Sequence, residues 1–167
     1  MVTINVESPD QADVRALIAE LDAYQYSLYP AESVYALDLT AVSAQDLVCV
    51  VARDAEQRAV ACGAVVLASE YGEIKRMYVR PDQRGNGLAK RILNLLEVSA
   101  RQAGRREIKL ETGPRQTGAL RLYAQAGYKV CGRFGDYPDD PLSVFMCKDL
   151  VISNDSQSGD KSLQCQP

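Results

Sequence analysis

The sequence predicts an α+β fold, in which a mixed and mostly antiparallel sheet carries helices on both faces. Strand-like runs at 74–79 and 108–111 flank an amphipathic helical run at 88–103, the pattern of a right-handed β-α-β unit with parallel strands. The runs at 47–53 and 60–67 flank a polar turn and predict an antiparallel hairpin. With 167 residues, the chain is long enough for one compact domain with its own core.

Ahead of the hairpin we expect a strand, a helix and a connection. Residues 3–6 alternate like a short strand. The Ser-Pro-Asp-Gln sequence at 8–11 predicts a helix start, with the serine as N-cap, the proline at the first helical position and the glutamine closing a capping box. Residues 24–35 form a tyrosine-rich connection around a proline, and 32–39 are weakly helical. The apolar face of the first helix consists of Val14, Leu17, Ile18 and Leu21.

Behind the hairpin, a strand at 72–79 leads into the helix at 88–103, which Gly104 ends. A second amphipathic helix covers 117–126 and ends at Gly127. The runs 128–131 and 143–148 then predict a closing antiparallel pair of strands.

The chain changes in composition after Leu150. Residues 151–167 are polar and contain few apolar side chains, too few to offset the entropy of ordering them. We therefore expect one domain over 1–150 and a disordered polar tail over 151–167.

Composition excludes several classes of function. A net charge of −3 and a pI of about 5.1 provide no basic footprint for nucleic acid. No apolar run approaches the length of a membrane span, and the N-terminus lacks the basic and apolar regions of a signal peptide. Five cysteines without C-x-x-C spacing favour a reduced, cytoplasmic protein. The absence of histidine excludes Ser-His-Asp and Cys-His catalysis and His-ligated metals, so no metal site is expected.

The stretch Arg84-Gly85-Asn86-Gly87-Leu88-Ala89, between a strand and a helix, has the character of a phosphate-binding loop. Glycines allow the backbone to approach a ligand closely, and N–H groups at a helix start attract anions. The spacing does not fit a Walker A loop, and Lys90 occupies the third glycine position of a dinucleotide-binding turn. The sequence therefore predicts a cradle for some other pyrophosphate.

With Gln83 before it, this loop resembles the R-x-x-G-x-G/A acetyl-CoA loop of the GNAT superfamily of N-acetyltransferases. The segment 119–128, Ala-Leu-Arg-Leu-Tyr-Ala-Gln-Ala-Gly-Tyr, is similar to the A-x-x-L-Y-x-x-x-G-F/Y segment of that family. A bacterial subgroup also shares the patterns Y-P-x-E-S, G-E-I-K-R-M-Y-V, L-E-T-G and F-G-x-Y-x-x-D-P-L-S-V, which stand here at 29–33, 72–79, 110–113 and 134–144. The resemblance covers 1–150 and implies a GNAT-like fold with acetyl-CoA as co-substrate.

The resemblance also implies site residues. The family frees main-chain N–H groups at the splayed strand, here Met77, Tyr78 and Val79, to bind the cofactor and the thioester oxygen. The loop residues Arg84, Gly85, Asn86, Gly87, Leu88 and Ala89 would hold the pyrophosphate. Many members have Asn three residues before the Ala of the A-x-x-L-Y segment, where this chain has Gln116.

Two residues are candidates for catalysis. Glu73, on the strand before the loop, would remove the amine proton directly or through water; alternatively it is a strand glutamate paired with Lys75 or an arginine. Tyr123 would protonate the departing thiolate; alternatively it packs in the core beside Leu120 and Leu122.

The acceptor end is predicted from loop residues. The substrate-binding candidates are Tyr29, Arg76, Thr112 and Tyr137. Aspartates at 136, 139 and 140 would attract a cation, and arginines at 76, 115 and 133 would hold a carboxylate; alternatively these are solvated loop charges. Both signs together favour a small, amino-acid-like amine.

The sequence therefore predicts an acetyl-CoA-dependent N-acetyltransferase for the primary amine of a small molecule. Protein or peptide N-acetylation is an alternative, and so is a non-catalytic acyl-CoA-binding sensor. The family further implies a homodimer.

Overall fold

The computed structural model describes residues 1–150 and contains a seven-stranded sheet in the order β1-β2-β3-β4-β5-β7-β6. Only β4 and β5 pair in parallel in this part of the chain, as the β-α-β pattern predicts, so the mixed, mostly antiparallel α+β fold is confirmed. The strands are β1 (Thr3–Val6), β2 (Leu47–Arg53), β3 (Ala59–Leu67), β4 (Tyr71–Val79), β5 (Glu107–Thr112), β6 (Lys129–Val130) and β7 (Val144–Asp149). The α-helices are α1 (Ala12–Leu28), α2 (Leu88–Gln102) and α3 (Thr117–Gln125).

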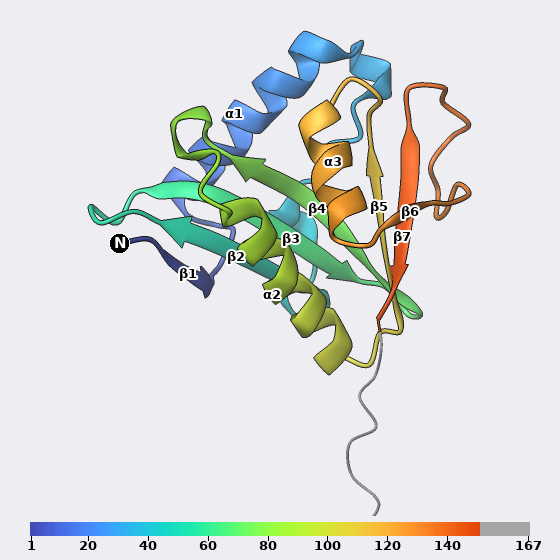
Figure 1. Cartoon of the computed structure of the whole chain (residues 1–167). Helices are drawn as coiled ribbons and strands as arrows, with labels where there is room; N and C mark the ends of the chain where they lie inside the picture. Colours follow the sequence, from blue (N-terminus) through green and yellow to red (C-terminus); the bar gives the residue numbers. More distant parts are fainter. Residues whose placement is uncertain (151–167) are drawn as a thin grey trace, which may run out of the picture.

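The helices lie on opposite faces of the sheet, with α1 on one face and α2 and α3 on the other (Figure 1). Under α1, Val14, Leu17 and Leu21 pack against β2 and β3. Under α2, Ile92, Leu93 and Leu96 are fully buried against the same strands and their neighbours. Because each such side chain gains about 1.5–3 kcal/mol from burial, these two layers hold the sheet between them.

The strands β4 and β5 separate at their carboxyl ends, and this separation positions the site. Their pairing ends at Ile74 and Leu110, although β4 continues to Val79 and β5 to Thr112. The register between β3 and β4 shifts in the same region, where Arg76 has a φ of 58°. Such a register shift is a β-bulge, in which one strand has an extra residue and bends. The bulge therefore lies where β4 diverges from β5.

The first helix differs from the prediction at both ends. It begins at Ala12 instead of Pro9, because the Ser8 hydroxyl accepts the N–H of Asp10 in a turn that precedes the helix. It continues to Leu28, through residues expected to form a connection, and ends where Tyr29 is extended before a proline. The weak helix expected over 32–39 is wrong. Short 3-10 turns at Ala31–Ser33, Leu39–Ala41 and Ala44–Asp46 replace it.

From residue 47 onward, each predicted helix and strand is present within one or two residues of its expected bounds. The expected tail at 151–167 lies outside the described residues. Over residues 1–150, none of the helices has the length and apolarity needed to cross a membrane.

Candidate active site

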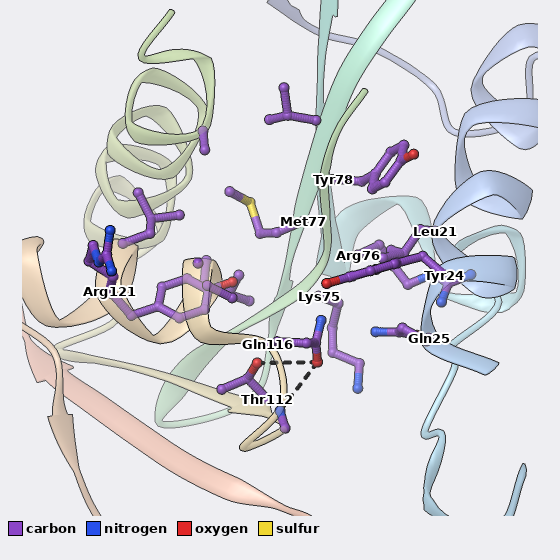
Figure 2. A pocket seen from close by; sticks show the side chains of 18 of the residues that line it. Leu21, Tyr24, Gln25, Lys75, Arg76, Met77, Tyr78, Thr112, Gln116 and Arg121 are labelled. Carbon is purple, nitrogen blue, oxygen red and sulfur yellow. Dashed lines mark hydrogen bonds between the residues drawn. The ribbon is translucent and has the colours of Figure 1, made fainter. Parts of the chain in front are cut away.

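A cavity of about 800 Å³ opens where β4 and β5 diverge. Its walls come from α1, the carboxyl halves of β4 and β5, the glycine loop before α2, and α3. Figure 2 shows Leu21, Tyr24 and Gln25 of α1 across this space from Arg121 of α3, with β4 between them. The cavity thus connects the glycine loop with the residues at the end of β5.

The glycine loop fits an anionic group. Gly85 and Gly87 have φ values of 79° and 72°, a conformation that favours glycine, and a Cβ on either would meet no atom within 4 Å. The first turn of α2 closes when the Arg91 N–H donates to the Gly87 carbonyl, so the amides before Arg91 have no acceptor inside the helix. No side chain caps this helix start. Open amides at a helix N-terminus are the arrangement that binds phosphates.

Arg84 joins the loop to the end of β4. Its Nε–H donates to the Val79 carbonyl at 3.0 Å, and its guanidinium lies 6.0 Å from the ring centroids of both Tyr24 and Tyr78. The side chain therefore holds the loop in place with its Nε donor and two ring faces. Asn86 donates to the Gln83 carbonyl at 3.3 Å and does not line the cavity.

The end of β4 offers main-chain groups to the cavity. The Arg80 N–H donates toward β3, to the Val60 carbonyl at 3.0 Å. Adjacent residues of a strand direct their main-chain groups to opposite edges, so the Val79 amide faces the side that β5 has left. Met77, Tyr78 and Val79 all line the cavity, but the same alternation turns the Tyr78 N–H toward β3.

Tyr123 combines burial with access to the cavity. It lies on α3, is 5% exposed and lines the cavity, and its ring centroid lies 5.6 Å from that of Tyr128. Burial is the sole cause that raises the pKa of Tyr123, because no hydrogen bond within residues 1–150 contributes. The phenol therefore keeps its proton over the physiological range and is available as a donor.

Gln116 occupies the turn between β5 and α3. Its Oε1 accepts the Gly113 N–H at 3.3 Å and the Thr112 hydroxyl at 3.5 Å, and Figure 2 draws both contacts. The side chain lines the cavity and closes this turn at the same time.

Glu111 is the carboxylate that the structure brings into the cavity, and the sequence analysis did not select it. The Ser143 hydroxyl donates to its Oε1 at 2.9 Å. Burial raises the pKa of Glu111 to about 7; Ser143 and Lys75 act to lower it, while Asp140 and Glu73 act to raise it. The alternation of side chains along β5 could have identified Glu111 from the sequence. Leu110 and Thr112 point into the core, so Glu111 lies on the opposite face of the strand.

Glu73 does not line the cavity and is held by Tyr137 and Lys75. Its Oε1 accepts a short hydrogen bond from the Tyr137 hydroxyl, which in turn accepts from Lys75 Nζ at 2.6 Å. Lys75 Nζ also lies 3.5 Å from the Glu73 carboxylate and lines the cavity. The pKa of Tyr137 is raised, mainly by burial and to a smaller extent by the nearby Glu73 charge.

The three arginines expected to hold a substrate carboxylate have other partners. Arg76 forms an ion pair with Asp22 at 2.7 Å, with its side chain 6% exposed. Arg115 donates to the Leu28 carbonyl, and Arg133 donates to the Tyr137 carbonyl at 3.3 Å.

Tyr29 supports the end of β5. Its hydroxyl accepts the Arg115 N–H at 2.9 Å, and a Cβ added to Gly113 would lie 2.0 Å from that hydroxyl oxygen. Thr112 is buried beside it, and both residues line the cavity. The glycine at 113 therefore allows the tyrosine to pack directly on the backbone.

Most of the predicted site residues meet at this cavity. Glu73, Asn86 and Tyr137 do not line it. Residues 1–150 contain no cluster of three or more His, Cys, Asp or Glu side chains arranged to hold a metal ion. Those that line the cavity are Tyr29, Arg76, Met77, Tyr78, Val79, Arg84, Gly85, Gly87, Leu88, Ala89, Thr112, Gln116 and Tyr123.

Comparisons with known proteins identify relatives of the whole domain. The model of the acetyltransferase (GNAT) family matches residues 14–128. A protein of Azospirillum brasilense named IAA acetyltransferase is 46% identical over 151 residues, covering 89% of this chain and 98% of that protein. A solved structure from Klebsiella pneumoniae, described as an acyl-CoA N-acyltransferase, is 40% identical with a TM-score of 0.81 and covers 90% of this chain and 99% of its own. PaiA N-acetyltransferase from Thermoplasma acidophilum was solved in complex with coenzyme A. It shares the fold at 17% identity and a TM-score of 0.70, and the match covers 89% of this chain and 99% of that protein.

Proposed function

This chain belongs to the GNAT acetyltransferase family, and we propose that it transfers the acetyl group of acetyl-CoA directly to the primary amine of a small molecule. The observation that carries the proposal is the cavity between β4 and β5, which joins a glycine loop with open amides to a half-buried carboxylate and a buried phenol. Those are the groups that an acetyl transfer needs: an anion cradle, a base and a proton donor.

The glycine-loop end suits acetyl-CoA. Gly85, Gly87 and the amides at the start of α2 would hold the pyrophosphate, and Arg84 would add positive charge next to it. Two proteins that share the fold, PaiA N-acetyltransferase and an aminoglycoside 6'-N-acetyltransferase, were solved with coenzyme A, which supports acetyl-CoA as the co-substrate. The Val79 amide, on the side that β5 has left, would then face the thioester oxygen.

The reaction requires this chain's own residues to remove a proton from the ammonium and to supply one to the sulfur. Only about one alkylammonium in a thousand is neutral at pH 7, so a carboxylate must take a proton before the nitrogen attacks the acetyl carbon. The sequence candidate is Glu73, and Glu111 is the cavity carboxylate with which it must be compared. As the new C–N bond forms and the C–S bond breaks, Tyr123 gives its proton to the sulfur and regains one from the amide nitrogen.

The structure favours a small acceptor over the two alternatives. The acceptor end is walled by side chains of Tyr29, Val34, Tyr35 and Leu142, which suits a compact molecule better than an extended peptide. A sensor module would have no use for a buried phenol and a half-buried carboxylate beside the same cavity, and both are present.

The test is acetyl-CoA-dependent release of coenzyme A thiol by the purified chain, over a panel of primary amines, peptides and IAA, the compound in the name of the Azospirillum relative. We expect acetyl-CoA to bind in calorimetry and thiol release with at least one small amine but not with peptides. Binding without transfer to any acceptor would favour the sensor, and absence of binding at millimolar acetyl-CoA would refute the proposal.

A further inference from the structure

We propose that the acceptor is a cationic amine on an uncharged body, and that the site discriminates against amines with a neighbouring carboxylate, such as free α-amino acids. This inference rests on the proposed function, because it names the acceptor class of that same cavity. It departs from the amino-acid-like acceptor that the mixture of charges in the sequence favours.

The ammonium position follows from the geometry at the end of β5. Pairing of the parallel strands ends at Ile74 and Leu110, so Lys75 and Glu111 are the next residues on each side of the opening. Within residues 1–150, Glu111 receives one side-chain hydrogen bond, from the neutral Ser143 hydroxyl, and has no cation within salt-bridge distance. A half-buried carboxylate without a cation, facing a cavity, is a place for a cationic ligand.

The two cations that line the cavity at this end, Lys75 and Arg76, are already engaged. Lys75 Nζ donates to the Tyr137 hydroxyl at 2.6 Å and lies 3.5 Å from the carboxylate of Glu73. The Arg76 guanidinium, buried beneath α1, is paired with Asp22 at 2.7 Å. A substrate carboxylate would have to displace one of these acidic partners before it gained a cation of its own.

The charges that face Glu111 add to the discrimination. Lys75 and Glu73 face Glu111 from β4. Asp140 and the Tyr137 phenol face it from the loop before β7, and the Tyr35 phenol faces it from the segment after α1. With Glu111 ionised, three carboxylates oppose one ammonium at this end of the cavity. A substrate carboxylate about 6 Å from a single like charge, at an effective dielectric constant of about 20, would lose roughly 100-fold in binding.

The remaining surface of the acceptor end is uncharged. Tyr29, Val34 and Leu142 line the cavity, and the Tyr35 hydroxyl is occupied because it donates to Asp140 at 2.6 Å. Aromatic and aliphatic walls of this kind bind an alkyl or aryl body by burying its apolar surface. The Glu111 carboxylate and the apolar walls together therefore fit an alkylamine or an arylalkylamine.

The experiment compares matched acceptors with the full chain and saturating acetyl-CoA: tyramine with tyrosine, phenethylamine with phenylalanine, and the methyl ester of each amino acid. The readout is kcat/KM for thiol release. We expect each amine to exceed its amino acid by about ten-fold or more, and each ester to recover most of the loss, because the ester keeps the bulk and removes the charge.

A variant provides a second and independent readout. In Glu73→Gln the ammonium of Lys75 loses its carboxylate partner, so the ratio of amino acid to amine turnover should rise, whatever the variant does to the absolute rate. Amino acids used as well as the matched amines, esters as poor as the amino acids, or an unchanged ratio in Glu73→Gln would each overturn the inference while leaving the acetyltransferase intact. Acetyl-CoA binding without transfer to any amine would instead overturn the proposed function and this inference with it.

Discussion

Replacing Glu111 by glutamine should have two effects. It should remove a candidate base from the proposed reaction, and it should remove a pH-dependent loss of folding stability. The substitution keeps the size of the side chain and its ability to accept the Ser143 hydroxyl, but it cannot ionise. Burial raises the pKa of Glu111 to about 7, from an ordinary value of 4.5. The difference between these two pKa values corresponds to about 3 kcal/mol between the two protonation states.

The sign follows from proton linkage. Between the ordinary pKa of 4.5 and the folded pKa of about 7, the folded chain holds a proton on Glu111 that the unfolded chain has lost. Stability therefore falls as the pH rises through this window, and above it the buried carboxylate costs about 3 kcal/mol. The variant lacks this cost, so it should match the wild type near about pH 4.5 and exceed it by about 6–12 °C in melting temperature near about pH 8.

The assay is thermal unfolding of both proteins at a series of pH values, plotted as the difference in melting temperature, so that other titrating groups cancel. Turnover of Glu111→Gln with a good amine acceptor should fall about 10²- to 10⁴-fold at neutral pH if Glu111 is the base. Glu73→Gln is the matched control, one strand away on the same face. A melting-temperature difference that does not vary with pH would show that Glu111 ionises normally, and normal turnover would return the role of base to Glu73.

Three further predictions test other parts of the site. Tyr123→Phe should lower acetyl transfer about ten-fold or more without loss of stability, because the buried hydroxyl makes no hydrogen bond within residues 1–150; a destabilised protein with normal turnover would assign Tyr123 to the core. Gly87→Glu should abolish acetyl-CoA binding in calorimetry, whereas Gly104→Glu, which carries the same backbone strain at a φ of 80° and also faces open space, should retain it; equal effects would assign the loss to strain. Gly113→Ala should cost about 1–3 kcal/mol in denaturant unfolding, because its Cβ would lie 2.0 Å from the Tyr29 hydroxyl, whereas Gly118→Ala has open space and should be neutral or stabilising.

The fold was predictable where local patterns and tertiary packing agree. The helix over 88–102 has one apolar face, a glycine before it and a glycine after it, and Ile92, Leu93 and Leu96 are buried as that face requires. The start of α1 was mistaken because the Ser8 hydroxyl caps a turn and not the helix. Its end was mistaken because tyrosines at 24 and 26, poor helix formers on average, continue the helix until the proline at 30 prevents it.

The geometry of the candidate site was easier to predict at the glycine loop, the proposed cofactor end, than at the proposed acceptor end. Positive-φ glycines and a helix start are local features, so Gly85 and Gly87 could be found from the sequence alone. The acceptor end depends on contacts between distant residues: Glu111 with Ser143, Glu73 with Tyr137, and Arg76 with Asp22. Charges read one at a time gave no indication of which were already neutralised by such partners, and this is why the sequence favoured an amino-acid-like acceptor.

The divergence of β4 from β5 links these observations. Past Ile74 and Leu110 the two strands no longer pair through main-chain hydrogen bonds. Main-chain groups of β4 then face the cavity from one side, and the Glu111 side chain faces it from the other. The same gap lies between Lys75, which is paired with Glu73, and Glu111, which has no cation within salt-bridge distance among residues 1–150. Because buried charge is costly unless it is paired, a cationic amine at Glu111 would stabilise the site that binds it, and loss of its proton there would begin the reaction.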